Sequence, residues 1–249
     1  MIRTESEDGI TTITIDRPEA MNSLSPEMMA QLEDALLAYK EDSQRVAVIT
    51  GSGERAFCSG ADLGRMANPD GRPTRRLRLF DGLDIDKPII GAINGHCLAG
   101  GLGVALLCDV RIASENATFG CMGTARGILP GAGQTKRLPE VVGLGNAMWL
   151  LLSAERIDSA EALRTGLVNR VVPQSDLKAA VNDWARILAS RAPLALKATK
   201  RAAIGGLTLN AADALKLEGE LQRPLFESED TREGLLAFKE KRAPVFKGR

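Results

Sequence analysis

Short apolar strands alternate with a glycine-opened helix in the middle of this chain, and this order constrains its fold more than any other feature. Residues 46–50 (VAVIT) and 87–94 (KPIIGAIN) have the character of buried strands, and residues 110–113 form a third strand-like segment. Residues 100–108 are predicted to form a helix that begins at glycine. Because strand, helix and strand in alternation imply parallel pairing with right-handed crossovers, we expect an α/β fold.

The segments that flank this pattern extend it. Residues 10–16 (ITTITID) alternate β-branched and polar side chains, as a strand does. Ser25 can cap a helix with Pro26 at its first position, and apolar residues follow at helical spacing. Residues 64–86, rich in proline, glycine and arginine, predict a mobile surface segment that ends in a short helix.

The last part of the chain has a different character, because strand patterns give way to helical ones. The predicted helices are residues 176–190, 193–204, 210–222 and 230–242. We therefore expect an α/β core over residues 1–190 and a helical C-terminal part over residues 191–249.

The charge balance argues against a polyanionic partner. The chain contains 32 lysines and arginines and 32 aspartates and glutamates, so no net charge attracts nucleic acid or an anionic membrane. No apolar run approaches the roughly 20 residues that cross a bilayer. Residues 1–9 lack the apolar core of a secretory signal, so we expect a cytoplasmic protein.

Metal and redox chemistry find little support in the sequence. The four cysteines lack the paired spacing of a metal site, and reduced thiols are expected in the cytoplasm. The single histidine, His96, excludes a His-rich metal centre and leaves one candidate base for a Ser-His-Asp triad. A packed or interface histidine is the favoured interpretation, and no metal or redox cofactor is expected.

Three glycine-containing segments carry a family resemblance. They are residues 56–66 (AFCSGADLGRM), 87–109 (KPIIGAINGHCLAGGLGVALLCD) and 119–139 (FGCMGTARGILPGAGQTKRLP). Each pattern alone is weak, but together and in this order they resemble the enoyl-CoA hydratase/isomerase (crotonase) superfamily. The resemblance implies a spiral of repeated β-β-α units, with a helical C-terminal part for trimerisation and active-site cover. It also implies an acyl-CoA thioester ligand, no cofactor beyond the coenzyme A of the substrate, and a homotrimer or dimer of trimers.

Members of this family hold the thioester carbonyl oxygen in an oxyanion hole of two backbone N–H groups. The resemblance assigns these donors to Ala61 and Gly100. The residues agree, because Gly100 and Gly101 open a helix, where unpaired N–H groups and the helix dipole favour an anion. The alternative is that these glycines serve only tight packing of helix on strand. By resemblance, the substrate path is lined by Ala20, Met21, Leu24, Ala56, Ala61, Asp62, Leu63, Leu98, Gly100, Gly101 and Arg126.

The sequence departs from its family where proton transfer takes place. Hydratases of the family use two glutamates for general acid–base work, and the aligned residues here are Gly103 and Gly123. A third slot, which holds an aspartate in some isomerases, aligns with Gly131. Glycine cannot move a proton, and each missing group typically costs about 10² to 10⁴ in rate. Ordinary two-glutamate hydratase activity is therefore expected to be weak or absent.

Three interpretations remain open. The chain can be a divergent enzyme whose proton-transfer group lies elsewhere or comes from the substrate, a bound water or an anion. It can be a non-catalytic acyl-CoA carrier or sensor, with a pocket that the glycines enlarge and neutralise for apolar acyl groups. An RNA-binding scaffold is the third, and the zero net charge argues against it.

Three further side chains bear on these interpretations. Arg126 brings a charge to a position that is usually apolar in the family; alternatively it faces solvent or pairs with Glu115 or Glu140. Cys58 and Cys121 are candidate nucleophiles, but neither has an adjacent base in the sequence, and buried inert thiols are commoner.

Overall fold

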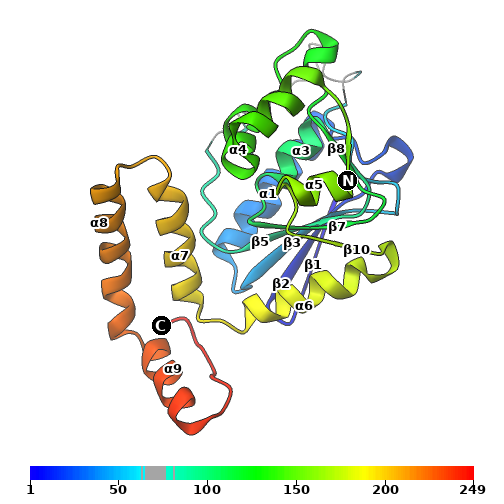
Figure 1. Ribbon diagram of the computed structural model, residues 1–249. Helices are drawn as coiled ribbons and strands as arrows, with labels where there is room; N and C mark the ends of the chain where they lie inside the picture. The colour runs from blue at the N-terminus through cyan, green and yellow to red at the C-terminus, as the bar shows by residue number, and fades with distance from the viewer. Residues whose placement is uncertain (63, 65–76, 81) are drawn as a thin grey trace.

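The computed structural model describes residues 1–62, 64, 77–80 and 82–249, and its core contains two β-sheets (Figure 1). The larger sheet has, in spatial order, β1 (Ile2–Glu7), β2 (Ile10–Ile15), β3 (Val46–Gly51), β5 (Ile89–Ile93), β7 (Val110–Ser114) and β10 (Arg170–Val172). β1 and β2 pair antiparallel, and the other neighbouring strands of this sheet pair parallel. The parallel pairing predicted for the three central strands is therefore confirmed.

A second, smaller sheet gives the core its spiral. Its strands, in spatial order, are β4 (Ala56–Cys58), β6 (His96–Leu98), β8 (Thr118–Gly120) and β9 (Ile157–Asp158). β3 leads into β4, β5 into β6 and β7 into β8, so each turn of the chain adds one strand to each sheet. In the described part of the chain, helices follow β6 and β8, and the predicted spiral of β-β-α units is confirmed.

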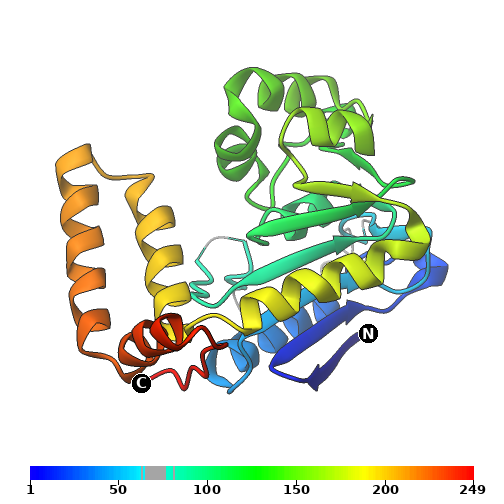
Figure 2. The ribbon, with the colours of Figure 1, turned by 60° about the horizontal axis from the view of Figure 1, so that its bottom comes forward.

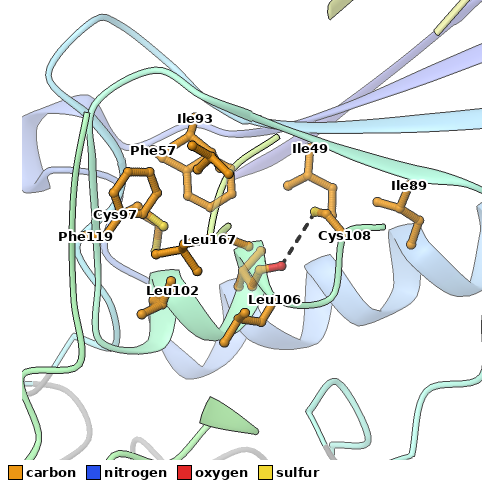
Figure 3. Close-up of a cluster of buried hydrophobic side chains, with 14 of the residues drawn as sticks. Ile49, Phe57, Ile89, Ile93, Cys97, Leu102, Leu106, Cys108, Phe119 and Leu167 are labelled. Carbon is orange, nitrogen blue, oxygen red and sulfur yellow. Dashed lines mark hydrogen bonds between the residues drawn. The ribbon is translucent and has the colours of Figure 1, made fainter. Parts of the chain in front are cut away.

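The side chains of the larger sheet alternate between two apolar layers. The helices that cover the core are α1 (Pro26–Glu41), α3 (Gly100–Ala105), α4 (Gln134–Ser153), α5 (Ser159–Arg164) and α6 (Leu177–Ala189). Ile49 of β3 belongs to the layer with α1, α3 and α4, where Leu102 also lies (Figure 3), whereas Val48 belongs to the layer under α6. α1 is the helix predicted after Ser25, whose Oγ accepts a hydrogen bond from the Met28 N–H at 3.3 Å.

The N-terminal hairpin was not anticipated from the sequence. β1 and β2 are joined at Asp8 and Gly9, whose φ angles are 51° and 80°. A two-residue hairpin turn with positive φ at both positions favours Asp-Gly, and it brings consecutive strands together antiparallel. The local signal was therefore present in the sequence.

The end of the chain forms a C-terminal arm, residues 193–249, that projects from the core (Figures 1 and 2). Its helices are α7 (Pro193–Gly206), α8 (Ala211–Gln222) and α9 (Glu229–Glu240). Together with α6 they confirm the four predicted helices. α7 and α8 bury none of their residues. The short helix predicted within residues 64–86 falls largely outside the described residues.

Candidate active site

The two residues assigned to the oxyanion hole, Ala61 and Gly100, lie side by side where the chain leaves β4 and where α3 begins. A Cβ atom built on Gly100 would lie 3.4 Å from the amide nitrogen of Ala61. One built on Gly60 would lie 3.0 Å from the amide nitrogen of Gly100. Gly60 has a φ of +105°, a conformation that glycine adopts readily, and this backbone brings the two amides close together.

Leu24 fixes the direction of the Ala61 N–H group. The Leu24 N–H donates to the Gly60 carbonyl at 2.8 Å, and the Asp62 N–H donates to the Leu24 carbonyl at 2.9 Å. Because this parallel bridge engages only the residues that flank Ala61, the Ala61 N–H points away from Leu24. Within the described part of the chain, neither this N–H nor that of Gly100 has an acceptor. Two such donors close together can hold an oxygen that carries negative charge.

Gly101 serves packing, in contrast to its neighbour Gly100. A Cβ atom on Gly101 would overlap the carbonyl oxygen of Cys58 in β4 and lie 2.9 Å from the Cys58 Cβ atom. α3 therefore approaches β4 at a distance that requires glycine. A Cβ atom on Gly100 would meet ordinary contact distances, so tight packing explains Gly101 and does not explain Gly100.

The segment of residues 128–132 fills the space beside Gly103 and Gly123, the two glycines at which the resemblance places catalytic glutamates in the family. A Cβ atom on Gly103 would lie 2.6 Å from the carbonyl oxygen of Ala132. One on Gly123 would lie 2.7 Å from the nitrogen of Pro130. The expectation that these glycines enlarge the pocket is wrong at both positions, because the chain itself occupies the volume where a longer side chain would begin.

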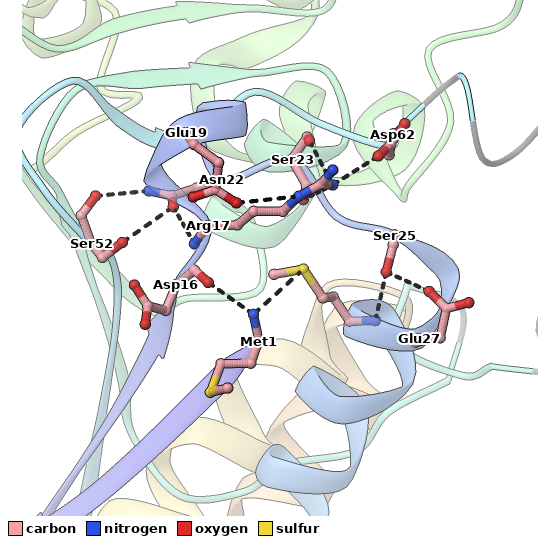
Figure 4. Close-up of polar contacts among 11 residues, drawn as sticks. Met1, Asp16, Arg17, Glu19, Asn22, Ser23, Ser25, Glu27, Ser52 and Asp62 are labelled. Carbon is pink, nitrogen blue, oxygen red and sulfur yellow. Dashed lines mark hydrogen bonds and ion pairs between the residues drawn. The ribbon is translucent and has the colours of Figure 1, made fainter.

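A turn before α1 is hydrogen-bonded to the segment that carries Ala61 (Figure 4). Asn22 is fully buried, and its Nδ2 donates to the Ala56 carbonyl at 2.7 Å. The Ser59 N–H donates to the Met21 carbonyl at 3.1 Å. Met21 and Asn22 adopt left-handed φ angles of 53° and 55°, which these contacts stabilise. Sequence reasoning did not single out Asn22, although it lies between the path residues Met21 and Leu24.

The assigned path residues on either side of Ala61 are therefore neighbours in space. Ala20 ends the short 3₁₀ helix that opens this turn, and Leu24 bridges to Ala61. Leu98 ends β6 and is buried. The N–H of the next residue, Ala99, donates to the Gly120 carbonyl at 2.8 Å and ties the start of α3 to β8. Leu63, the remaining residue of the predicted path on this side, lies outside the described residues.

Arg126 lies at the surface. Its Nη1 donates to the Met122 carbonyl at 3.0 Å. Among the described residues it forms no ion pair with Glu115 or Glu140, and Glu140 pairs instead with Lys136. Of the two alternatives to a role in the site, pairing with Glu115 or Glu140 is therefore wrong, and the solvent-facing position describes this side chain.

His96 lies in a packed position between two strands. The Nδ1 atom of His96 lies 2.7 Å from the Thr118 Oγ1 atom across β6 and β8, which is the packed position expected for it. The described residues contain no group of three or more His, Cys, Asp or Glu side chains that could hold a metal ion. No helix in the described part of the chain is long and apolar enough to cross a membrane.

The four cysteines are free and buried, which makes them poor nucleophiles. Burial raises the pKa of Cys58, Cys108 and Cys121 to about 12 and raises that of Cys97 as well. Because the thiolate is the reactive form, we expect no alkylation of the folded protein by iodoacetamide at pH 8, and full alkylation in guanidinium. Mass spectrometry of both samples tests this. Fast labelling of Cys58 or Cys121 in the folded protein would restore them as candidate nucleophiles.

Known proteins share this fold over its whole length. Residues 5–249 match the family model described as enoyl-CoA hydratase/isomerase. The chain is 40% identical over 255 residues to (E)-benzylidenesuccinyl-CoA hydratase of Thauera aromatica, with 98% of each chain covered. It is 38% identical to short-chain-enoyl-CoA hydratase of Clostridium acetobutylicum, with 96% of this chain and 94% of the relative covered.

A solved structure supports the same assignment. Enoyl-CoA hydratase from Bacillus anthracis superposes with a TM-score of 0.91 at 35% identity, and the match covers 100% of this chain and 99% of that chain. The fold is therefore of the crotonase type. The chain belongs to the enoyl-CoA hydratase/isomerase family.

Proposed function

We propose that this chain binds acyl-CoA thioesters and polarises the thioester carbonyl through the N–H groups of Ala61 and Gly100. The observation that carries the proposal is the pair of adjacent amides that have no acceptor among the described residues. Leu24 and the close packing of Gly101 hold these amides in place. Negative charge that develops on the carbonyl oxygen would be stabilised by these fixed donors, as formation of a thioester enolate requires. The relatives named as hydratases of CoA thioesters support an enzyme of this kind.

The proposed chemistry differs from the two-glutamate mechanism of the family, because residues 103 and 123 are glycines and provide no carboxylate. Gly103 and Gly123 carry no acid or base, and residues 128–132 pack against both of them. A proton would have to come from the substrate, a bound water or an anion. The alternative, a non-catalytic acyl-CoA carrier or sensor, would also follow from glycine at these two positions. The names of the relatives give this alternative no support.

The remaining parts of the proposal concern the ligand path and assembly. We propose that coenzyme A runs along the turn of residues 20–24 and the backbone of residues 56–62, with no other cofactor. We also propose that residues 191–249 assemble the protein into a homotrimer or dimer of trimers and cover the active site, in the cytoplasm. Large apolar side chains exposed on the arm support self-association: Ile204, Leu207, Leu215, Phe226, Leu235 and Phe238.

A paired measurement on the purified protein tests the function. Binding of butyryl-CoA is compared by calorimetry with binding of S-butyl-CoA, the thioether that lacks only the carbonyl oxygen, and hydration of crotonyl-CoA is followed alongside. We expect tighter binding of the thioester, and hydration at least about 10²-fold slower than that of a family hydratase assayed alongside. Failure to bind either ligand would overturn the proposal. Hydration at ordinary rates would show that a proton-transfer group lies elsewhere than at residues 103 and 123, which are both glycine.

A further inference from the structure

An ion pair links the two backbone segments that meet at Ala61 (Figure 4). Arg17 Nη1 lies 2.7 Å from Asp62 Oδ2, and the same nitrogen lies 3.3 Å from Ser23 Oγ. Ser23 directly precedes Leu24, and Asp62 directly follows Ala61. One guanidinium group therefore contacts a neighbour of each partner in the Leu24–Ala61 bridge that sets the direction of the Ala61 N–H.

The surroundings make this contact stronger than an ordinary surface ion pair. The side chains of Arg17 and Asp62 are 25% and 19% exposed, so solvent screens them only in part. A charge-assisted hydrogen bond of 2.7 Å lies in the short range typical of strong ones. The competing carboxylate, Glu19, is 3.9 Å from Arg17 Nε and 74% exposed, so it competes weakly.

Hydrogen bonds also hold the backbone of Arg17, which limits the movement of its guanidinium group. The Arg17 N–H donates to Asn22 Oδ1 at 2.9 Å, and the Asn22 N–H donates to the Arg17 carbonyl at 2.9 Å. Asn22 is in turn bonded to the Ala56 carbonyl at the start of β4. The turn therefore holds the segment of residues 56–62 at both ends, through Asn22 at one and through Arg17 at the other.

We propose that Arg17 and Asp62 are positioning residues that hold the Ala61 N–H where the thioester carbonyl needs it. This inference rests on the proposed function, because it assigns a role within the same site. The two backbone bonds of Leu24 set the direction of the Ala61 N–H, and the ion pair holds the Asp62 side of the same segment against the turn. Fixed donors matter because a misplacement of about 1 Å can cost about 10²-fold in rate.

The test separates the carbonyl interaction from general binding. Butyryl-CoA and S-butyl-CoA are titrated into the full-length protein and into the variants Arg17→Met, Asp62→Asn and the double variant. The ratio of the two dissociation constants reports the carbonyl contact alone. We expect each single variant to reduce this ratio, and so the preference for the thioester, about tenfold; a change in coenzyme A binding that affects both ligands equally cancels in the ratio. The double variant should lose no more than either single variant, because both act through one contact.

A spectroscopic readout and a matched control complete the experiment. The infrared carbonyl band of ¹³C-labelled butyryl-CoA should shift less on binding to Arg17→Met than to the unaltered protein, and Arg17→Lys should recover part of the shift. Arg3→Met, which removes the 3.0 Å pair with Asp16 at the surface, should change neither ratio nor band.

Three results would decide against the inference, and they differ from failure of the proposed function. An unchanged thioester preference and an unchanged carbonyl band in both single variants would show that the ion pair does not position the donor. Equal loss of affinity for both ligands would make the pair a contact for coenzyme A or a folding element instead. If the unaltered protein binds neither ligand, or binds both equally well, the proposed function fails and the inference fails with it.

Discussion

Replacing Gly101 with alanine is expected to lower the free energy of unfolding by about 1–3 kcal/mol and to abolish the preference for a thioester carbonyl. The new Cβ atom would overlap the Cys58 carbonyl oxygen, and backbone atoms of both elements would have to move apart. Those elements are α3, which begins with Gly100, and β4, which leads to Ala61. The substitution should therefore lower the stability of the fold and displace the two donor N–H groups at the same time. Urea unfolding and the comparison of butyryl-CoA with S-butyl-CoA measure the two effects.

Gly219 provides the matched control for this substitution. It lies inside α8, and a Cβ atom there would meet no atom within 4 Å in the described part of the chain. Gly219→Ala should therefore raise stability by about 0.5–1 kcal/mol, the usual gain for alanine over glycine in a helix, and leave ligand binding unchanged. A Gly101→Ala protein as stable as the unaltered one would show that α3 and β4 are not as close as the structure places them.

The parts of the fold that the sequence predicted are those with a local physical signal. β3 is a continuous β-branched and apolar run, which a buried parallel strand requires. Two helices of the arm, α8 and α9, begin at side chains that cap them: Asn210 accepts from the Asp213 N–H, and Ser228 accepts from the Thr231 N–H. Such signals lie within a few residues of the element they define, so one sequence suffices to find them.

The smaller sheet and the contacts around Ala61 lack such a signal. Strands of two or three residues, such as β4 and β9, are too short to show an alternation of period two. Arg17 and Asp62 are separated by 45 residues, and nothing near either one indicates the other. Gly100 and Gly101 cannot be told apart in the sequence motif. In the structure, the N–H of Gly100 has no acceptor among the described residues, whereas Gly101 allows the Cys58 carbonyl to approach closely. Only the folded chain distinguishes these roles.

Placing glutamate at both Gly103 and Gly123, the positions that the resemblance aligns with catalytic glutamates, is expected to destabilise the protein and to produce no gain in crotonyl-CoA hydration. From alignment alone, the double variant should regain the two groups that hydration uses. The structure predicts otherwise, because the first atom of each new side chain would lie within 2.7 Å of Ala132 or Pro130. Each overpacked site should cost about 1–3 kcal/mol, and a carboxylate forced among buried atoms adds a desolvation penalty. Urea unfolding and a hydration assay at saturating crotonyl-CoA measure the outcome.

Single alanine substitutions distinguish crowding from the effect of charge. Gly103→Ala and Gly123→Ala should already destabilise the protein, whereas Gly131→Ala should not, because a Cβ atom there would have its nearest neighbour at 4.0 Å. If the double glutamate variant hydrated crotonyl-CoA, residues 128–132 would have to yield readily, and the missing carboxylates alone would limit the reaction. If it does not, the close packing of residues 128–132 is what requires glycine at both positions. Hydration of crotonyl-CoA by a two-glutamate mechanism would then require a change in that segment as well as the two glutamates.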